Sequence, residues 1–209
     1  MQLKTPLVLN TTLNVDVPTQ EVLQKLPCGI HRGVMADVER EFSCMVDTLK
    51  TAPVNLDDYE IDIKVHMLMK GQYPCIPNWH CDNIPRDGNG NLIYDIALAD
   101  VEHPMLLWLS GNPTTEFLEN PIYLLSSPRN HGELHERLVK DAATYKSKPI
   151  PERTWVSMDQ LTPHRGRASE ENTWRIFIRL THKNIVTARP VISVVRRHCQ
   201  VYLPADFHW

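Results

Sequence analysis

The sequence predicts an α+β protein in which a helical N-terminal segment precedes a β-rich core. Apolar residues at helical spacing occur mainly before residue 50, and short segments of alternating apolar and polar residues follow residue 60. Sixteen prolines against eight glycines also favour many strand ends and fixed turns over long helices. A chain of 209 residues can bury its own core, so we expect one domain over residues 1–209.

The first 52 residues are expected to form a helical support for this core. Weak alternation over residues 1–17 predicts an edge strand, and Thr19 is placed to cap a short helix over Gln20–Leu26. From Gly33 to Leu49 the apolar residues recur at helical spacing, which predicts an amphipathic helix packed across a sheet.

Residues 60–205 are expected to form the β-rich core, with a helical insertion near 130–145. One face of the first strand would carry Ile61, Ile63, Val65, Met67 and Met69, and the other Asp62, Lys64 and His66. Further strands are expected at Leu92–Ala99, Pro104–Leu109, Ile122–Leu125, Arg153–Met158, Thr173–His182 and Val191–Leu203, and a helix at Asn130–Tyr145. This order matches a double-stranded β-helix, or jelly roll, with N-terminal helices packed on one sheet.

Composition argues against several classes of protein. No apolar run approaches the roughly 18 residues of a membrane span, and the N-terminus lacks the apolar stretch of a secretory signal, so we expect a cytoplasmic protein with no membrane partner. Five cysteines without a CxxC pair argue against a disulfide framework or a zinc ribbon.

Charge is unevenly distributed along the chain. The net charge of −3 gives no global reason to expect a polyanionic partner, but residues 164–199 carry eight basic and two acidic side chains, a difference of +6. Such a segment could bind an anionic substrate or nucleic acid, or it could be a charged strand edge that resists aggregation.

The histidine and aspartate of Trp79-His80-Cys81-Asp82 lie two residues apart. On extended backbone, His80 and Asp82 would point to one side, while Trp79 and Cys81 would face away. His164 can complete a set of two histidines and one carboxylate, which leaves three positions open on a metal and suits non-haem Fe(II). A second pair, His131 and His135, has helical spacing but no HExxH glutamate, so a solvated helix face is expected there.

Arginines follow the second histidine of this set. In Thr173–His182, alternation places Arg175, Phe177 and Arg179 on one side of a strand, and arginine binds carboxylates with a fixed fork of donors. Asn78 precedes His80 by two residues and shares its face, so its side chain could also reach a bound acid.

Together, His80, Asp82, His164 and Arg175 resemble the pattern of the Fe(II)- and 2-oxoglutarate-dependent oxygenases, over residues 60 to 182. The arginine eleven residues after His164 is similar to that of the taurine dioxygenase and phytanoyl-CoA hydroxylase branches. The resemblance implies iron at the triad, with 2-oxoglutarate and O2 as co-substrates. It also implies that Arg175 holds the distal carboxylate of 2-oxoglutarate, and that Arg179 shares this role or meets the prime substrate.

The implied activity is hydroxylation coupled to decarboxylation of 2-oxoglutarate to succinate. The prime substrate stays open among a small molecule, an amino-acid side chain and a nucleobase. Two other functions use the same residues: a non-catalytic jelly-roll protein that binds a ligand through its arginines, and a cupin-like metalloenzyme that does not use 2-oxoglutarate.

Overall fold

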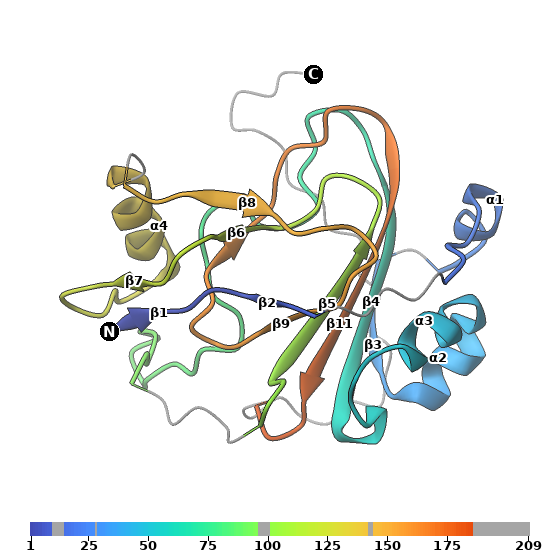
Figure 1. Cartoon of the computed structure of the whole chain (residues 1–209), viewed down its shortest axis with the longest axis horizontal. Helices are drawn as coiled ribbons and strands as arrows, with labels where there is room; N and C mark the ends of the chain where they lie inside the picture. The colour runs from blue at the N-terminus through green and yellow to red at the C-terminus, as the bar shows by residue number, and fades with distance from the viewer. Residues whose placement is uncertain (10–14, 28, 96–100, 142–143, 186–209) are drawn as a thin grey trace.

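The structure of the protein is a computed structural model that describes residues 1–9, 15–27, 29–95, 101–141 and 144–185. Antiparallel sheets are the main regular structure of this part of the chain, and helices lie at opposite ends of the molecule (Figure 1). The fold is therefore mixed α/β and dominated by antiparallel sheets, an arrangement compatible with a β-sandwich. The expected strand Val191–Leu203 lies outside the described residues.

Among the described residues the larger sheet has six strands, and every neighbouring pair is antiparallel. Its two longest strands, β4 and β11, pair over all ten residues of each. In sheet order the strands are β2 (Leu7–Val8), β9 (Val156–Met158), β5 (Met105–Ser110), β11 (Thr173–His182), β4 (Tyr59–Leu68) and β3 (Gly29–Gly33).

The smaller sheet consists of short strands, in the order β10 (His164–Arg165), β6 (Glu116–Leu118) and β8 (Ser147–Pro149). An isolated bridge between His80 and His164 adds one more extended segment beside β10. A separate ribbon pairs β1 (Gln2–Leu3) with β7 (Ile122–Tyr123). The bridge matters for function because it brings two distant histidines side by side.

The helices are short. They comprise α1 (Gln20–Leu23), α2 (Met35–Glu41), α3 (Val46–Lys50), α4 (His131–Lys140) and two 3₁₀ turns, η1 (Ser43–Met45) and η2 (Leu56–Asp58). Helices α2 and α3 lie beside β3 and β4, whereas α4 lies at the other end of the molecule (Figure 1). Asn130 caps the N-terminus of α4, and its side chain accepts a 2.9 Å hydrogen bond from the Glu133 backbone N–H.

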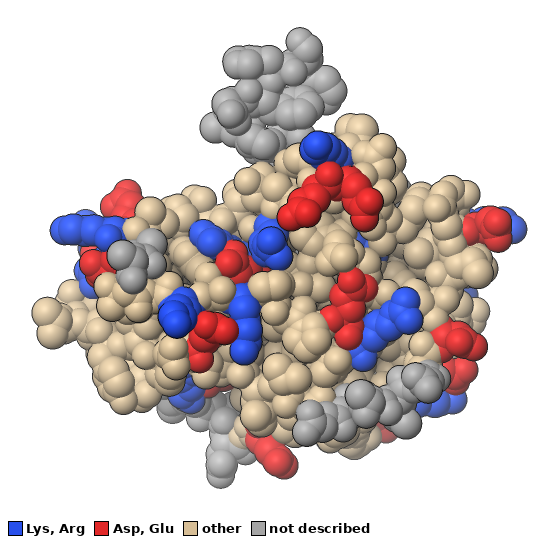
Figure 2. Space-filling model, turned by 45° about the horizontal axis from the view of Figure 1, so that its top comes forward, with Lys and Arg blue, Asp and Glu red and all other residues tan. Residues whose placement is uncertain are grey.

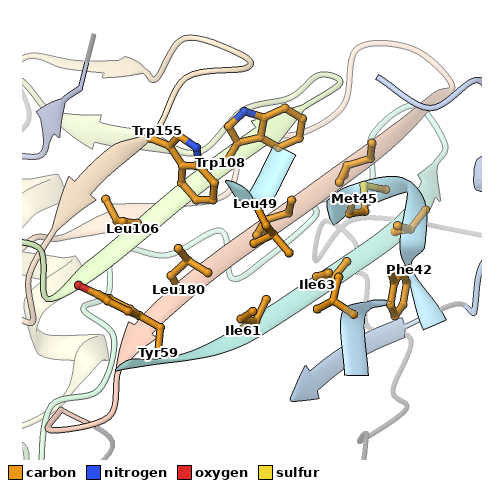
Figure 3. Close-up of a cluster of buried hydrophobic side chains, with 14 of the residues drawn as sticks. Phe42, Met45, Leu49, Tyr59, Ile61, Ile63, Leu106, Trp108, Trp155 and Leu180 are labelled. Carbon is orange, nitrogen blue, oxygen red and sulfur yellow. The ribbon is translucent and has the colours of Figure 1, made fainter. Parts of the chain in front are cut away.

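The main apolar core lies between the larger sheet and the N-terminal helices. Side chains of β4, β5 and β11 meet those of α2, η1 and α3 there, as Figure 3 shows for Phe42, Met45, Leu49, Ile61, Ile63 and Leu180. The Trp155 indole also enters this core and donates a 2.9 Å hydrogen bond to Thr51 Oγ1. This packing fixes one face of the larger sheet and leaves the other face for the site.

The expected single helix over Gly33–Leu49 is wrong, because the chain breaks at Phe42. Phe42 has φ −137° and ψ 44°, and its ring packs edge-on against His31 at a centroid distance of 4.7 Å. Four apolar positions of the pattern are nevertheless buried in this core, namely Val38, Phe42, Met45 and Leu49, whereas Val34 is exposed. Tertiary packing of the phenylalanine has therefore overridden the local helical spacing.

Several strands also differ from the prediction, either in where they begin and end or in whether they form at all. Residues 92–95 of the expected strand Leu92–Ala99 form no strand beyond a single Arg86–Leu92 bridge, and residues 96–99 lie outside the described part. Met67 and Met69 are exposed, so the expected buried apolar face of β4 ends at Val65. The short strands β3, β6, β8 and β10 were not expected, because two to five residues rich in glycine, proline or charge carry no clear alternation.

Candidate metal centre

The structure brings His80, Asp82 and His164 together. His80 and His164 face each other in the backbone bridge. Their backbone N to O distances are 3.0 and 2.9 Å, and their ring centroids lie 4.5 Å apart. Asp82 follows two residues after His80, and its Oδ2 lies 3.5 Å from His164 Nε2. The three side chains offer ligand atoms within 4.8 Å of one another, so this group could hold a metal ion.

The backbone fixes both histidine rings. His80 Nδ1 lies 2.8 Å from the carbonyl oxygen of Asn78, and His164 Nδ1 lies 3.1 Å from that of Thr162. Each Nδ1–H can donate to its carbonyl, which leaves Nε2 without a proton and available to a metal.

The local environment favours the protonation states that bind metals. Burial lowers the pKa of His80 to about 4, so the ring is neutral near pH 7. Burial alone would raise the pKa of Asp82, but the Arg179 guanidinium and the two histidines hold it well below its usual value. Neutral imidazole and ionised carboxylate are the forms that coordinate a cation.

Arg179 contacts the aspartate of this group directly. Its Nη1 donates to Asp82 Oδ2, and its Nη2 lies 2.6 Å from Oδ2 of Asp62, the residue opposite it on β4. Asp62 is 2% exposed and also accepts hydrogen bonds of 2.6 and 2.8 Å from Arg32. Burial alone would raise the pKa of Asp62, but Arg179 and Arg32 hold it below its usual value. Arg179 is therefore paired with two carboxylates of the protein.

Arg175 has a different environment. It is 1% exposed, and its Nε donates a 2.8 Å hydrogen bond to the Pro113 carbonyl oxygen. Within the described residues its guanidinium forms no ion pair, and its Nη2 has no hydrogen-bond partner. Burial lowers the pKa of Arg175 to about 10, which still leaves it charged near pH 7. A buried cation without a counter-ion is costly, so this position favours an anionic ligand.

A cavity of about 170 Å³ connects these groups. The triad and both arginines line it, and Leu107, Met158 and Phe177 supply apolar walls. A single water needs only about 10–15 Å³ of such volume, so the space is large enough for a small organic molecule. The arginines lie on one strand four residues apart, with Arg179 beside the triad and Arg175 further along the strand.

The loop 73–77 forms another wall of the cavity. Lys64 Nζ donates a 2.9 Å hydrogen bond to Pro74 O, and the Gly166 backbone N–H donates to Ile76 O at 2.8 Å. A Cβ at Gly166 would lie 2.7 Å from the Cys75 carbonyl oxygen, so only glycine permits this approach. Gly166, two residues after His164, thus allows the loop to pack closely against the metal-binding segment.

Some residues named from the sequence lie outside the cavity. The Asn78 side chain is exposed and lines a neighbouring surface hollow, so only its carbonyl group serves the site, through His80. Trp79 and Cys81 are buried in an apolar cluster, as expected. The His131 ring lies 6.1 Å from that of His80, whereas His135 accepts a hydrogen bond from the Trp79 backbone N–H. In the described part of the chain, these two histidines belong to no group of metal ligands.

Several basic residues of the last quarter either line the cavity or contact a protein acceptor, in the part of the chain that the structure describes. Arg175 and Arg179 line the cavity, Arg165 pairs with Glu116 at 2.7 Å, and Lys183 donates to a backbone carbonyl. Arg189, Arg196 and Arg197 lie outside the described residues. On the face drawn in Figure 2, acidic and basic side chains are interspersed rather than separated by sign.

The cysteines of the described part form no disulfide. Cys44, Cys75 and Cys81 are free thiols, whereas Cys28 and Cys199 lie outside it. None of the helices there is long and apolar enough to cross a membrane.

Sequence reasoning missed the contribution of β4. Asp62 and Lys64 line the cavity, and His66 is buried on the same face. The signal was present as alternating polar residues in a strand whose other face is apolar, but the partner strand and its register were unknown. The register of β4 with β11 places these polar residues opposite Arg179, Phe177 and Arg175.

Comparison with known proteins identifies no relative. No protein-family model matches the chain, and neither a curated protein nor a solved structure is similar to it. The residues of the site are therefore the basis on which a function can be assigned.

Proposed function

We propose that this protein is an Fe(II)- and 2-oxoglutarate-dependent dioxygenase that hydroxylates an organic substrate. The observation that carries the proposal is the pairing of two features in one cavity. The His80, Asp82 and His164 group lies at one end, and the buried Arg175, which has no ion-pair partner among the described residues, lies further along β11.

The strand order supports a jelly-roll core for this enzyme. From β4 onward the chain crosses repeatedly between the two sheets, and only β6 and β8 follow each other in the same one. The larger sheet receives β4, β5, β9 and β11, and the smaller one receives the His80 segment, β6, β8 and β10. Eight such segments in two antiparallel sheets are typical of a jelly roll. The cavity is lined from both sheets, as a site inside such a core would be.

The donor set fits iron. Two histidines and one carboxylate leave open positions on a metal, which is the ligand set of non-haem Fe(II) oxygenases. When bound, Fe(II) would supply oxidation of a substrate C–H bond to C–OH by O2, coupled to conversion of 2-oxoglutarate to succinate and CO2. The protein's tasks are to hold these groups in position and to exclude side reactions.

The chain's own residues account for recognition of 2-oxoglutarate. Arg175 is placed to pair with the distal carboxylate, and such a pair is stronger in a dry cavity than on the surface. Leu107, Met158 and Phe177 surround the path between the arginine and the triad with apolar surface. This arrangement favours a short molecule with an anionic group at each end.

Arg179 receives a different role from that implied by the family resemblance. Because it already binds Asp62 and Asp82, we assign it to orientation of the metal-binding carboxylate. The carboxylate–arginine–carboxylate contact would restrict Asp82 to one rotamer, as outer partners of metal ligands commonly do.

The test is conversion of isotopically labelled 2-oxoglutarate by the Fe(II)-loaded protein in air. Labelled succinate and CO2 should form in equal amounts, and their formation should cease in His80→Ala and His164→Ala. If the wild-type protein binds Fe(II) but neither binds nor consumes 2-oxoglutarate, a cupin-like metalloenzyme replaces the proposal. If it binds no metal at all, the site is a ligand-binding cavity without redox chemistry.

A further inference from the structure

A second buried side chain whose polar atoms lack partners among the described residues, His66, lies opposite Arg175. His66 of β4 faces Arg175 of β11 in register, so both side chains project from the same side of the sheet. His66 is 3% exposed, and among the described residues neither of its ring nitrogens has a hydrogen-bond partner. Because one ring nitrogen carries a proton, a buried donor is left unsatisfied on the residue opposite Arg175, whose own Nη2 also has no partner among the described residues.

The surroundings of His66 keep the ring neutral. Burial lowers the pKa of His66 to about 2, with help from the positive charges of Lys64 and Arg175. A neutral imidazole therefore offers one N–H donor without adding a third positive charge to those of Lys64 and Arg175. Either ring nitrogen can carry the proton and donate, because no protein group in the described part fixes the tautomer.

A carboxylate matches these two donors. It has two oxygens and about four lone-pair directions, so one group can accept from a guanidinium and from an imidazole N–H together. Four residues along β11 separate Arg175 from Arg179, roughly 13 Å of extended chain. His66 and Arg175 thus lie away from the triad, where the end of a chelating ligand opposite its metal-binding group would be held.

We propose that His66 donates a second hydrogen bond to the carboxylate bound by Arg175, and so makes the site selective for 2-oxo acids with a second, distal carboxylate. This inference rests on the proposed function, since it concerns how 2-oxoglutarate is recognised. Arg175 supplies the charge, while His66 supplies a directed donor that a 2-oxo acid without a distal carboxylate cannot use. Such an acid leaves both donors buried and unsatisfied, which is a strong basis for rejection.

Calorimetric titration of the Mn(II)-loaded full chain with two acids tests the inference. The acids are 2-oxoglutarate and 2-oxopentanoate, which has the same carbon chain but no distal carboxylate. In His66→Leu, the Kd of 2-oxoglutarate should rise about 10- to 100-fold, the range expected for one lost hydrogen bond to a charged group. The Kd of 2-oxopentanoate should not rise.

Two variants serve as comparisons. His66→Gln keeps an N–H donor and should retain most of the preference for 2-oxoglutarate. His31→Leu removes another buried histidine, on the helix-covered face of the same sheet, and should leave both Kd values unchanged. Should His66→Leu not fold, His66→Met provides the same loss of a donor.

The outcomes separate this inference from the proposed function. Wild-type binding of 2-oxoglutarate with no change in His66→Leu would overturn the role of His66 and leave the proposed function intact. An equal loss of affinity for both acids would also overturn it, since His66 would then maintain only the shape of the site. Binding of neither acid by the Mn(II)-loaded wild-type protein would refute the proposed function, and this inference with it.

Discussion

Arg175→Met replaces the buried guanidinium with an apolar side chain that can fill the same space. The variant loses one hydrogen bond, from Nε to the Pro113 carbonyl, which contributes about 0.5–1.5 kcal/mol. It also removes a buried cation that has no ion-pair partner among the described residues, which is itself unfavourable. Without ligand, we therefore expect an unfolding free energy equal to that of the wild-type protein or above it.

Relative to the wild-type protein, Arg175→Met should lose stability only when 2-oxoglutarate is present, because it loses stabilisation by the ligand. At a ligand concentration of 100 times Kd, binding stabilises the wild-type protein by about 2.7 kcal/mol, or roughly 5–11 °C in Tm. Loss of one or more charge-assisted hydrogen bonds, each about 1.5–3 kcal/mol, raises Kd at least about tenfold. The stabilisation at the same concentration then falls to about 1.4 kcal/mol or less.

Thermal unfolding of the Mn(II)-loaded proteins, with and without 2-oxoglutarate, measures both quantities. Arg129→Met is the matched control, because Arg129 is an exposed arginine at the start of α4 and should leave the ligand-induced shift unchanged. A variant Arg175→Met that is much less stable without ligand, yet keeps the full shift, would refute the reasoning and make Arg175 a structural residue.

Three further predictions concern stability and the cavity wall. Asp62→Asn removes the buried carboxylate that pairs with the half-buried Arg32 and Arg179, and should lower the unfolding free energy in urea by about 3–5 kcal/mol, whereas the exposed Asp57→Asn should not change it. Because the pKa of His66 is about 2 when folded and near 6.5 when unfolded, the unfolded state takes up the proton first as the pH falls. His66 should thus remove about 1.4 kcal/mol of stability per pH unit below about pH 6.5, and His66→Leu should show a shallower decline under acid. Gly166→Ala forces its new methyl group against Cys75, and should weaken Mn(II) binding in calorimetry while an alanine at the open Gly88 does not.

The triad could be predicted from the sequence because its chemistry is encoded locally. A histidine and an aspartate two residues apart share one side of extended backbone, and a later histidine needs only one backbone bridge to join them. The same alternation predicted that Arg175 and Arg179 lie on one side of a strand. It could not predict that Arg175 is buried with no ion-pair partner among the described residues.

The remaining features depend on register between distant segments. The contact of Arg179 with Asp62 joins residues 117 positions apart, and no local pattern predicts that pairing. For the same reason, a count of basic residues could not reveal that Arg175 and Arg179 are internal. The break at Phe42 likewise follows from packing against His31 on another element, which overrides helical spacing.

The most direct test of the central claim is anaerobic titration of the Fe(II)-loaded protein with 2-oxoglutarate, followed by visible absorption. We expect the weak charge-transfer band of an iron-bound 2-oxo acid, which should be absent in His80→Ala and require much higher concentrations in Arg175→Met. Fe(II) binding without this band at any 2-oxoglutarate concentration would contradict the assignment of the cavity to 2-oxoglutarate.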